Sequence, residues 1–289
     1  MLPQLPENIL RLREKIRACT LCPRNCRVDR TAGQIGSCRI GASAVVSSAG
    51  PHFGEEPCLV GRGGSGTIFF SGCNLHCVFC QNCDISQATD GQEVPPGQVA
   101  SLGLALQRQG CVNVNFVTPT HVAHAVAEAV HLARGSGLTV PIVYNCGGYE
   151  SVEMLRLLEG LVEIYMPDFK YADPVAGKKY SDAPDYPAVA TAALAEMYRQ
   201  VGALRIADSG VAERGVLVRH LVMPHDLARS REVIDIVAAA APGTGINVMG
   251  QYRPAHRAAE FPELLDCPAA AEIRELRDYA ASRGLLCVG

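Results

Sequence analysis

The stretch "FSGCNLHCVFCQNCDIS" (residues 70–86) places four cysteines within eleven residues: Cys73, Cys77, Cys80 and Cys83. Thiolates at this spacing on a short loop can hold zinc or an iron–sulfur cluster. If all four cysteines bind, they can close a tetrahedral zinc site. If only the first three bind, they hold three corners of a [4Fe–4S] cluster and leave its fourth iron open to a substrate. The spacing alone does not decide between the zinc site and the iron–sulfur cluster.

The whole sequence has the composition of an ordinary globular protein. Its 289 residues are 48% hydrophobic and 19% charged, with a net charge of −3. This charge argues against a dedicated nucleic-acid binder, and no apolar run approaches the roughly 18 residues of a membrane span. The first twenty residues show no signal-peptide pattern. Thirteen cysteines, an odd and clustered set, suit metal binding in a reducing compartment better than disulfides, so we expect a cytoplasmic protein.

The chain divides into two parts by pattern. Residues 1–61 hold a cysteine cluster and little periodicity, and we expect them to form a metal-binding amino-terminal extension. Residues 62–289 alternate short apolar runs with helical patterns, which is typical of a parallel α/β sheet, either open or curled into a barrel. The apolar runs, which we predict to be strands, are 66–70, 111–117, 138–145, 161–166, 215–223 and 246–250. Residues 172–188 are the longest stretch that we expect to be irregular.

A polar cluster follows each of the six predicted strands. The clusters are Cys73–Cys83, "TPTH" (118–121), "NCGGYE" (145–150), "PDFK" (167–170), "PHD" (224–226) and "QYRPAH" (251–256). The carboxyl ends of parallel strands meet at one edge of the sheet, where sites are built. We therefore expect one site ringed by six loops.

The motif "CNLHCVFC" (73–80), placed after the first strand, resembles the signature of the radical S-adenosylmethionine (SAM) superfamily. Further stretches, among them "VYNCGGYES", "MPDFKY" and "QYRPAH", resemble the PflX-type relatives of pyruvate formate-lyase activating enzyme. The likeness covers about residues 19–260. It implies a partial (β/α)6 barrel related to the TIM barrel.

The resemblance also implies a mechanism. Cys73, Cys77 and Cys80 hold a [4Fe–4S] cluster, and Phe79 lies beside it. SAM chelates the open iron and is cleaved by one electron to a 5′-deoxyadenosyl radical, which abstracts hydrogen. A low-potential donor, flavodoxin or ferredoxin, is implied, with no nucleic-acid or membrane partner. The best specific expectation is activation of a glycyl-radical partner protein. Radical modification of a small molecule or peptide is the second enzymatic reading, and a non-catalytic zinc or Fe–S interaction protein is the competing class.

Two loops are expected to contact SAM. "TPTH" sits where similar enzymes bind the methionine amino group, so Thr118 and Thr120 are candidates. Thr118 before a proline is also a good helix N-cap. Asn145 is followed by glycines that let backbone approach a ligand. An Asn stands here where the family has a carboxylate, which leaves a bound monovalent cation in doubt.

The later strands supply the charged candidates. Asp168 and Lys170 are two apart on a strand end and so point the same way. In similar enzymes this pair contacts SAM, whereas a plain ion pair at the rim is the alternative. Arg219, a charge within an apolar strand, needs a partner, and the carboxylate of SAM is the partner we expect.

A second cysteine set lies in "CTLCPRNCRVDRTAGQIGSC" (19–38). Cys19, Cys22, Cys26 and Cys38 form a four-thiolate pattern that either zinc or a second [4Fe–4S] cluster can use. The spacing does not decide between them. A cluster would suit electron relay toward the radical site, and zinc would suit a small module with little core.

Overall fold

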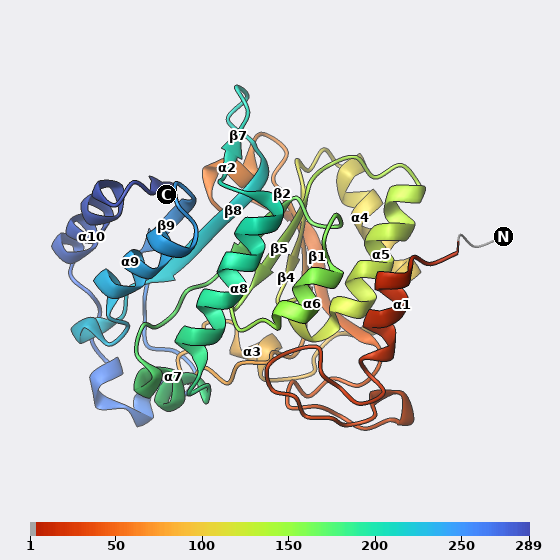
Figure 1. Ribbon diagram of the computed structural model, residues 1–289, viewed down its shortest axis with the longest axis horizontal. Coiled ribbons are helices and arrows are strands. Elements are labelled where there is room, and N and C mark those ends of the chain that lie inside the picture. Colours follow the sequence, from red (N-terminus) through yellow and green to blue (C-terminus); the bar gives the residue numbers. More distant parts are fainter. Residues whose placement is uncertain (1–3) are drawn as a thin grey trace.

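The computed structural model describes residues 4–289, and its centre is one large sheet (Figure 1). The strand order is β10-β9-β8-β6-β5-β4-β2-β1-β3, with β7 paired to β8. The neighbours from β2 to β9 are all parallel. These six are β2 (Ser65–Phe70), β4 (Val114–Val117), β5 (Ile142–Cys146), β6 (Ile164–Pro167), β8 (Ala212–Leu221) and β9 (Gly245–Met249). They correspond to the six predicted strands, and together with the covering helices they confirm the partial barrel.

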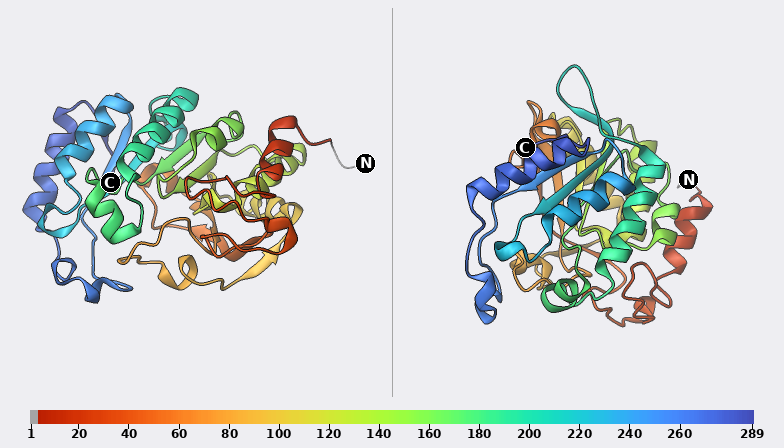
Figure 2. Two further views of the ribbon diagram at one scale, coloured as in Figure 1. Left: turned by 60° about the horizontal axis from the view of Figure 1, so that its bottom comes forward. Right: turned by 60° about the vertical axis from the view of Figure 1, so that its left-hand side comes forward.

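Helices connect the parallel strands and cover one side of the sheet, as Figure 2 shows from two further directions. They are α4 (Pro96–Arg108), α5 (Ala123–Gly135), α6 (Val152–Leu157), α8 (Tyr186–Val201), α9 (Ser230–Ala240) and α10 (Ala270–Ser282). Helix α5 buries Val126, Ala129, Val130 and Ala133, whose spacing places them on one face. A right-handed strand–helix–strand crossover is what a parallel sheet requires.

The core has two layers because the strands are buried on both faces. On the concave side, Val143, Ile164, Met166 and Leu217 form the inner cluster. The convex side packs against the helices, where Tyr144 and Tyr165 meet edge to face with ring centroids 5.8 Å apart. Each large apolar side chain buried in this way contributes about 1.5–3 kcal/mol. The two layers hold the carboxyl ends of the strands in a fixed arc.

The amino-terminal region joins the sheet instead of standing apart from it. It contains α1 (Glu7–Glu14), a short 3-10 turn η1 (Arg30–Ala32), β1 (Ala44–His52) and α2 (Pro57–Val60). Strand β1 pairs antiparallel with β2 on one side and with β3 (Gln92–Val94) on the other. Residues 1–61 are therefore continuous with the barrel through β1, although the sequence pattern changes near residue 61.

The segment predicted to be irregular, 172–188, is mostly helical. It contains α7 (Pro174–Ser181) and the first turn of α8. The Asp173 side chain caps α7 by accepting from the Val175 backbone N–H, and Pro174 occupies the first turn. These are strong start signals, so the prediction was wrong because it weighed the prolines and glycine above the cap.

The remaining elements are short. They are α3 (Cys83–Ser86), η2 (Thr120–Val122), β7 (Arg205–Ile206), η3 (Pro224–Asp226), η4 (Ala258–Glu260), η5 (Pro262–Leu264) and β10 (Leu286–Cys287). Across residues 4–289, none of the helices has the length and apolar character needed to cross a membrane.

Candidate active site

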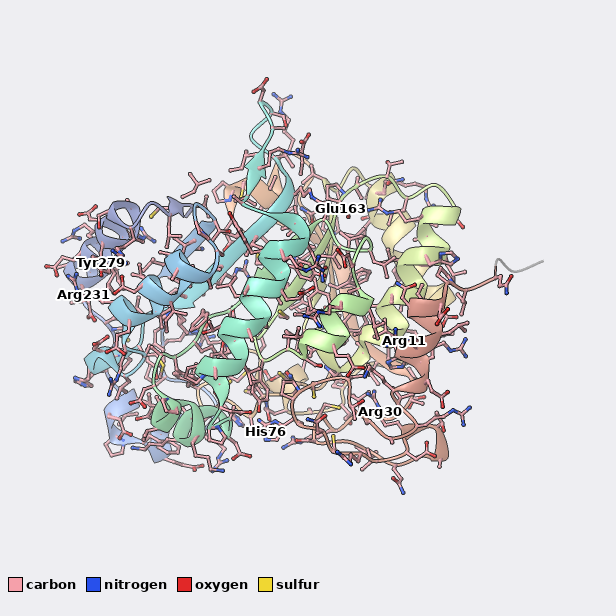
Figure 3. All side chains as sticks on the ribbon, in the orientation of Figure 1. Arg11, Arg30, His76, Glu163, Arg231 and Tyr279 are labelled. Atoms are coloured by element: carbon pink, nitrogen blue, oxygen red, sulfur yellow. The ribbon has the colours of Figure 1, made fainter. Side chains whose placement is uncertain are left out.

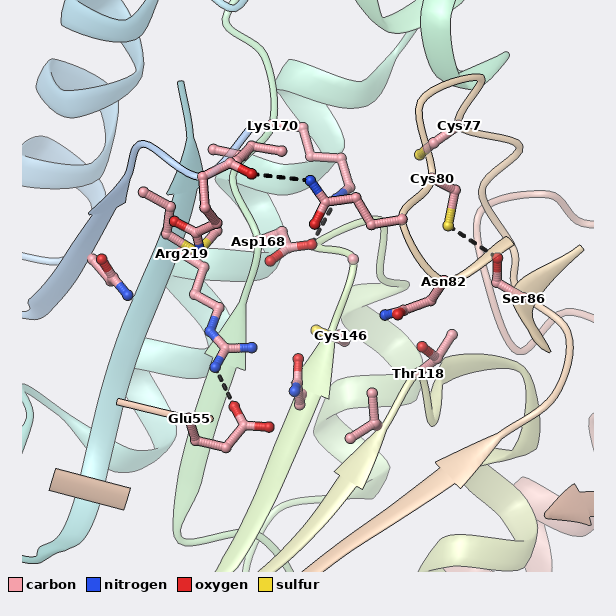
Figure 4. A pocket seen from close by; sticks show the side chains of 18 of the residues that line it. Glu55, Cys77, Cys80, Asn82, Ser86, Thr118, Cys146, Asp168, Lys170 and Arg219 are labelled. Carbon is pink, nitrogen blue, oxygen red and sulfur yellow. Dashed lines mark hydrogen bonds and ion pairs between the residues drawn. The ribbon is translucent and has the colours of Figure 1, made fainter. Parts of the chain in front are cut away.

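A cavity of about 560 Å³ opens at the carboxyl ends of the parallel strands. Cys73, Cys77 and Cys80 line it on one side, and Figure 4 shows the last two opposite Glu55. Every parallel strand from β2 to β9 also contributes lining residues from its end or from the loop after it. The structure thus brings five of the six predicted loops to one place, whereas the loop 224–226 does not line the cavity. A cavity of this size suits a small-molecule cofactor together with a substrate group.

Hydroxyl and backbone groups hold the three thiols in place. The Sγ of Cys77 lies 2.9 Å from the Ser181 hydroxyl, and the Sγ of Cys80 lies 3.1 Å from the Ser86 hydroxyl. The Leu75 backbone N–H donates to the Sγ of Cys73 at 3.4 Å. N–H and O–H groups directed at sulfur stabilise thiolates that bind iron and tune the cluster they hold.

Burial makes the thiols of Cys73 and Cys77 poor acids unless a cation binds them. Desolvation raises the pKa of Cys73 to about 12 and raises that of Cys77, with the neighbouring cysteines adding to the effect at Cys73. A bound metal centre reverses this cost because it deprotonates its thiol ligands. The donor set is soft and sulfur-only, which is what an iron–sulfur cluster uses.

Cys83 stands apart from the other three. It begins helix α3, lies outside the cavity lining, and its Sγ contacts the Asp84 carboxylate at 3.7 Å. Three thiols therefore face the cavity while the fourth faces away. This arrangement favours the three-ligand reading of the loop over the closed zinc site.

Phe79 forms an apolar wall beside the thiols. It is 5% exposed, lines the cavity, and packs edge-on against Tyr171 and at a tilt against Tyr252, with centroids 6.4 and 6.1 Å apart. An aromatic cage of this kind keeps the side chain in one rotamer and limits water near the metal site.

Asp168 and Lys170 form an ion pair that lines the cavity. Lys170 Nζ donates to Asp168 Oδ2 at 2.6 Å (Figure 4). Burial alone would lower the pKa of Lys170, but the charge of Asp168 raises it well above its ordinary value. The ammonium is thus held charged in the cavity, where it can also meet a carboxylate of a ligand.

Thr118 and Thr120 have different positions. Thr118 lines the cavity with φ +59°, a left-handed conformation that is strained for a β-branched residue, and its N–H donates to the Asn145 carbonyl at 2.8 Å. Asn145 also lines the cavity. Thr120 is fully buried outside it, and its hydroxyl donates to Glu150 Oε1 at 2.6 Å. The Thr120 hydroxyl thus bonds to a buried carboxyl in this structure, and its expected contact with SAM stays a prediction.

Arg219 lines the cavity but already has anionic partners. Its Nε donates to Glu56 Oε1 at 2.8 Å and its Nη2 to Glu56 Oε2 at 2.6 Å, and it also pairs with Glu55. Asn247 donates to Glu56 Oε1 as well, at 2.8 Å. Although burial would raise it, these bonds lower the pKa of Glu56. Two glutamates thus contact the guanidinium in this structure, and the expected pairing of Arg219 with the carboxylate of SAM stays a prediction.

Sequence reasoning missed Glu55 and Glu56. They precede α2 in the region assigned to the amino-terminal extension, and about 160 residues separate them from Arg219. No periodicity marks them. The only signal was Arg219 itself, which had to find a buried anion somewhere in the chain.

The amino-terminal cysteines form a separate group. Cys19, Cys22 and Cys38 are buried, Cys26 is half-buried, and none of the four lines the cavity. The side chains as placed are gathered without closing around a single ion: within residues 4–289, no three His, Cys, Asp or Glu side chains stand close enough to ligate one metal ion.

The comparisons with known proteins agree with this geometry. Residues 59–159, which include the three cavity thiols, match the family described as "4Fe-4S single cluster domain". An uncharacterized protein of Methanocaldococcus jannaschii, MJ0674, is 33% identical over 257 residues, covering 85% of this chain and 69% of that protein. The chain belongs to the same family as this archaeal protein.

Two solved structures share the fold of this chain. SuiB of Streptococcus suis matches with a TM-score of 0.50 at 10% identity, over 75% of this chain and 46% of SuiB. HydG, a maturase of the [FeFe]-hydrogenase, matches with a TM-score of 0.52 at 14% identity, over 76% of this chain and 49% of HydG. This chain therefore spans about half the length of the solved proteins it matches. The PflX-type subgroup is not distinguished by these matches and stays a prediction.

Proposed function

We propose that this protein is a radical SAM enzyme that cleaves SAM reductively and abstracts a hydrogen atom from a substrate bound in the cavity. One observation carries the proposal: Cys73, Cys77 and Cys80 face the same cavity as the Asp168–Lys170 pair, and Cys83 does not. A three-thiolate site leaves one metal position free for a ligand, and the charged pair can meet that ligand.

The residues present fit both groups. Cys73, Cys77 and Cys80 would hold a [4Fe–4S] cluster, and Phe79 would shield it from water. When bound, the cluster and SAM together supply a 5′-deoxyadenosyl radical. Lys170 and the backbone around Thr118 would hold the polar end of SAM, and Asp168 keeps Lys170 charged and oriented. The protein thereby positions the cofactor and excludes water.

The experiment is anaerobic reconstitution with iron and sulfide, followed by reduction and addition of SAM. We expect 5′-deoxyadenosine and methionine in equal amounts, with no product in unreconstituted protein. The Cys267→Ser variant, which changes an exposed thiol outside the cavity, should match the wild type. A reconstituted, reducible protein that releases no 5′-deoxyadenosine would contradict the proposal.

For the substrate, activation of a glycyl-radical partner protein is the first candidate, because the motifs resemble those of activating enzymes. The side of the cavity lined by Glu55 and Glu56 favours a second candidate, a small cationic molecule or peptide. Glu55 and Glu56 pair with one guanidinium there, and Glu55 also contacts the His52 imidazole at 3.5 Å, so with that ring neutral one carboxylate charge is in excess on that side. An ammonium or guanidinium group on a substrate would balance it.

Deuterium transfer distinguishes the two candidates. Cells of the source organism grown on deuterated glycine are lysed, and the lysate is separated by filtration into a protein fraction and a small-molecule fraction. Deuterium in 5′-deoxyadenosine with the protein fraction alone supports the glycyl-radical partner. Stimulated SAM cleavage by the small-molecule fraction alone, reduced in Glu55→Gln, supports the cationic substrate. Flavodoxin or ferredoxin as donor, and the cytoplasmic location, belong to the same proposal.

A further inference from the structure

Outside the cavity, one loop carries four cysteines with metal-ligand spacing: Cys19, Cys22, Cys26 and Cys38. It runs from the end of α1 to β1 with only the η1 turn as regular structure. Such a loop has little core of its own to hold it. It lies outside residues 59–159, so the single-cluster family match does not account for it.

The four thiols converge on one place. Each of the other three acts electrostatically on Cys22. A Cβ built on Gly36 would lie 3.3 Å from the Sγ of Cys26 and 3.6 Å from the Sγ of Cys38, so those two sulfurs are at most 6.9 Å apart (3.3 plus 3.6 Å). Gly36 thus leaves room that a side chain would fill. Backbone bonds support the arrangement: Asn25 N–H donates to the Cys22 carbonyl, and Arg27 N–H to the Cys19 carbonyl.

Arg30 is an independent observation that points to an anion here. It is 1% exposed, and its Nη1 lies 3.7 Å from the Sγ of Cys19. Its other bonds go to neutral carbonyls of Gly41 and His121, and its Nη2 finds no hydrogen-bond partner among residues 4–289. Within residues 4–289, no carboxylate forms an ion pair with it. Figure 3 labels Arg30 beside the amino-terminal loop.

A buried guanidinium keeps its charge and needs a partner. Neutral thiols cannot supply one, whereas four thiolates around a metal centre carry a net negative charge. The unpaired Nη2 of Arg30 also bears on whether the metal centre is a zinc ion or a [4Fe–4S] cluster. A zinc ion offers only the four thiolate sulfurs as acceptors, while a [4Fe–4S] cluster adds bridging sulfides that accept hydrogen bonds.

The loop also abuts the cavity thiols. The Cys38 carbonyl lies 2.5 Å from where a Cβ on Gly72 would be, and Gly72 precedes Cys73. Arg24 donates to the Asn74 carbonyl at 2.7 Å, inside the cavity motif. A centre in this loop is therefore adjacent to the loop that holds the cavity thiols, which suits a redox group more than a remote structural ion.

We propose that Cys19, Cys22, Cys26 and Cys38 hold a second [4Fe–4S] cluster, closed to substrates, with Arg30 as its buried counter-cation. All four corners are thiolate-bound, so this cluster does not bind SAM. This inference is independent of the proposed function, because it rests on a different set of residues.

The first test isolates the second site. The variant Cys73→Ala, Cys77→Ala, Cys80→Ala is purified anaerobically and reconstituted. We expect about four irons per chain, half of the wild-type content, and a reduced EPR signal that SAM leaves unchanged. Cys267→Ser should keep the full wild-type iron content. Zinc in place of iron in the triple variant would overturn the cluster assignment, and absence of any metal would overturn the centre itself.

The second test addresses Arg30 through a potential. In the triple-variant background, Arg30→Gln removes the positive charge beside the cluster and should lower its midpoint potential, measured by EPR-monitored redox titration. Arg30→Lys, which keeps the positive charge, should have a midpoint potential close to that of the protein with Arg30. Equal potentials in all three proteins would overturn the role of Arg30. If Arg30→Gln fails to fold, the Lys variant still has to keep the cluster, and its loss there would count against the assignment.

Discussion

Two regions of this molecule carry four closely spaced cysteines, and the structure treats them differently. In residues 73–83, three thiols face the cavity and Cys83 faces away. In residues 19–38, all four thiols gather outside the cavity. Each region also has an arginine with little exposed surface: half-buried Arg219 at the cavity pairs with two glutamates, whereas buried Arg30 meets no carboxylate within residues 4–289.

The difference teaches that spacing reveals a thiolate site but not its number of ligands. That number depends on which sulfurs share a surface, and the surface is set by distant elements. Ser181 on α7 contacts Cys77, and Ser86 on α3 contacts Cys80, while Cys83 has only its neighbour Asp84. Nearly the same cysteine spacing can thus encode a site with three thiolate ligands and one free metal position, or a site with four thiolate ligands.

The sharpest way to break the comparison is to remove one cysteine at a time from the cavity loop. Cys77→Ala should lose SAM cleavage to background, because a two-thiolate site does not hold the cluster. Cys83→Ala should keep full cleavage and the wild-type iron content. The measurement is 5′-deoxyadenosine per chain after anaerobic reduction. Cleavage that survives in Cys77→Ala, or disappears in Cys83→Ala, would refute the three-ligand site.

A second way is to change the charge that serves the open site. Lys170→Met should weaken SAM binding by about 10- to 100-fold, because a charge-assisted hydrogen bond contributes roughly 1.5–3 kcal/mol. Iron content should not change, since Lys170 is not a cluster ligand. Binding is measured as the SAM concentration that half-converts the EPR signal of the reduced cluster. If Lys170→Met binds SAM with wild-type affinity, the Asp168–Lys170 pair is only an ion pair at the rim and does not hold SAM.

The two arginines give a third comparison. In metal-free protein, Arg219→Met should destabilise the fold by about 3–5 kcal/mol, because Glu55 and Glu56 lose their buried cation. Arg30→Met in the same metal-free protein should destabilise it less, because the substitution removes hydrogen bonds to the Gly41 and His121 carbonyls but breaks no ion pair within residues 4–289. Urea unfolding measures both changes. Equal losses from the two substitutions would mean that Arg30 has an anion in the apo protein.

The last test concerns Glu150, which burial shifts to a pKa of about 7. A carboxyl whose folded pKa is raised is most favourable below its unfolded pKa, near 4.5, and costs stability as pH rises toward 7. The full penalty is about 3 kcal/mol. Glu150→Gln should therefore gain stability over the wild type between pH 5 and pH 8, measured by urea unfolding at each pH. A constant difference across that range would contradict the shift.

Much of the fold could be predicted because it depends on local pattern. The six apolar runs and the polar residues after them are short-range signals, and they placed Asn145, Asp168 and Thr118 at one edge. Segment 172–188 was misjudged, since the Asp173 cap had to be weighed against its prolines.

The side of the cavity where Glu55 and Glu56 meet Arg219 could not be predicted from the sequence pattern. Glu55 and Glu56 reach Arg219 only because β1 pairs with β2 and carries the chain round to the inner side of the barrel. The bond between Thr120 and Glu150 was missed for a related reason: Glu150 lies 30 residues on, and only the packed structure brings the two together. Contacts between distant buried polar groups carry no periodic signal.

The account depends most on the open corner of the cavity cluster, and one measurement tests it directly. A variant with Cys19, Cys22, Cys26 and Cys38 all changed to Ala is reduced without oxygen, and its EPR spectrum is recorded before and after SAM is added. We predict a single [4Fe–4S] signal that SAM changes. A signal that stays the same with saturating SAM would mean that the iron is capped by protein, and would contradict the account.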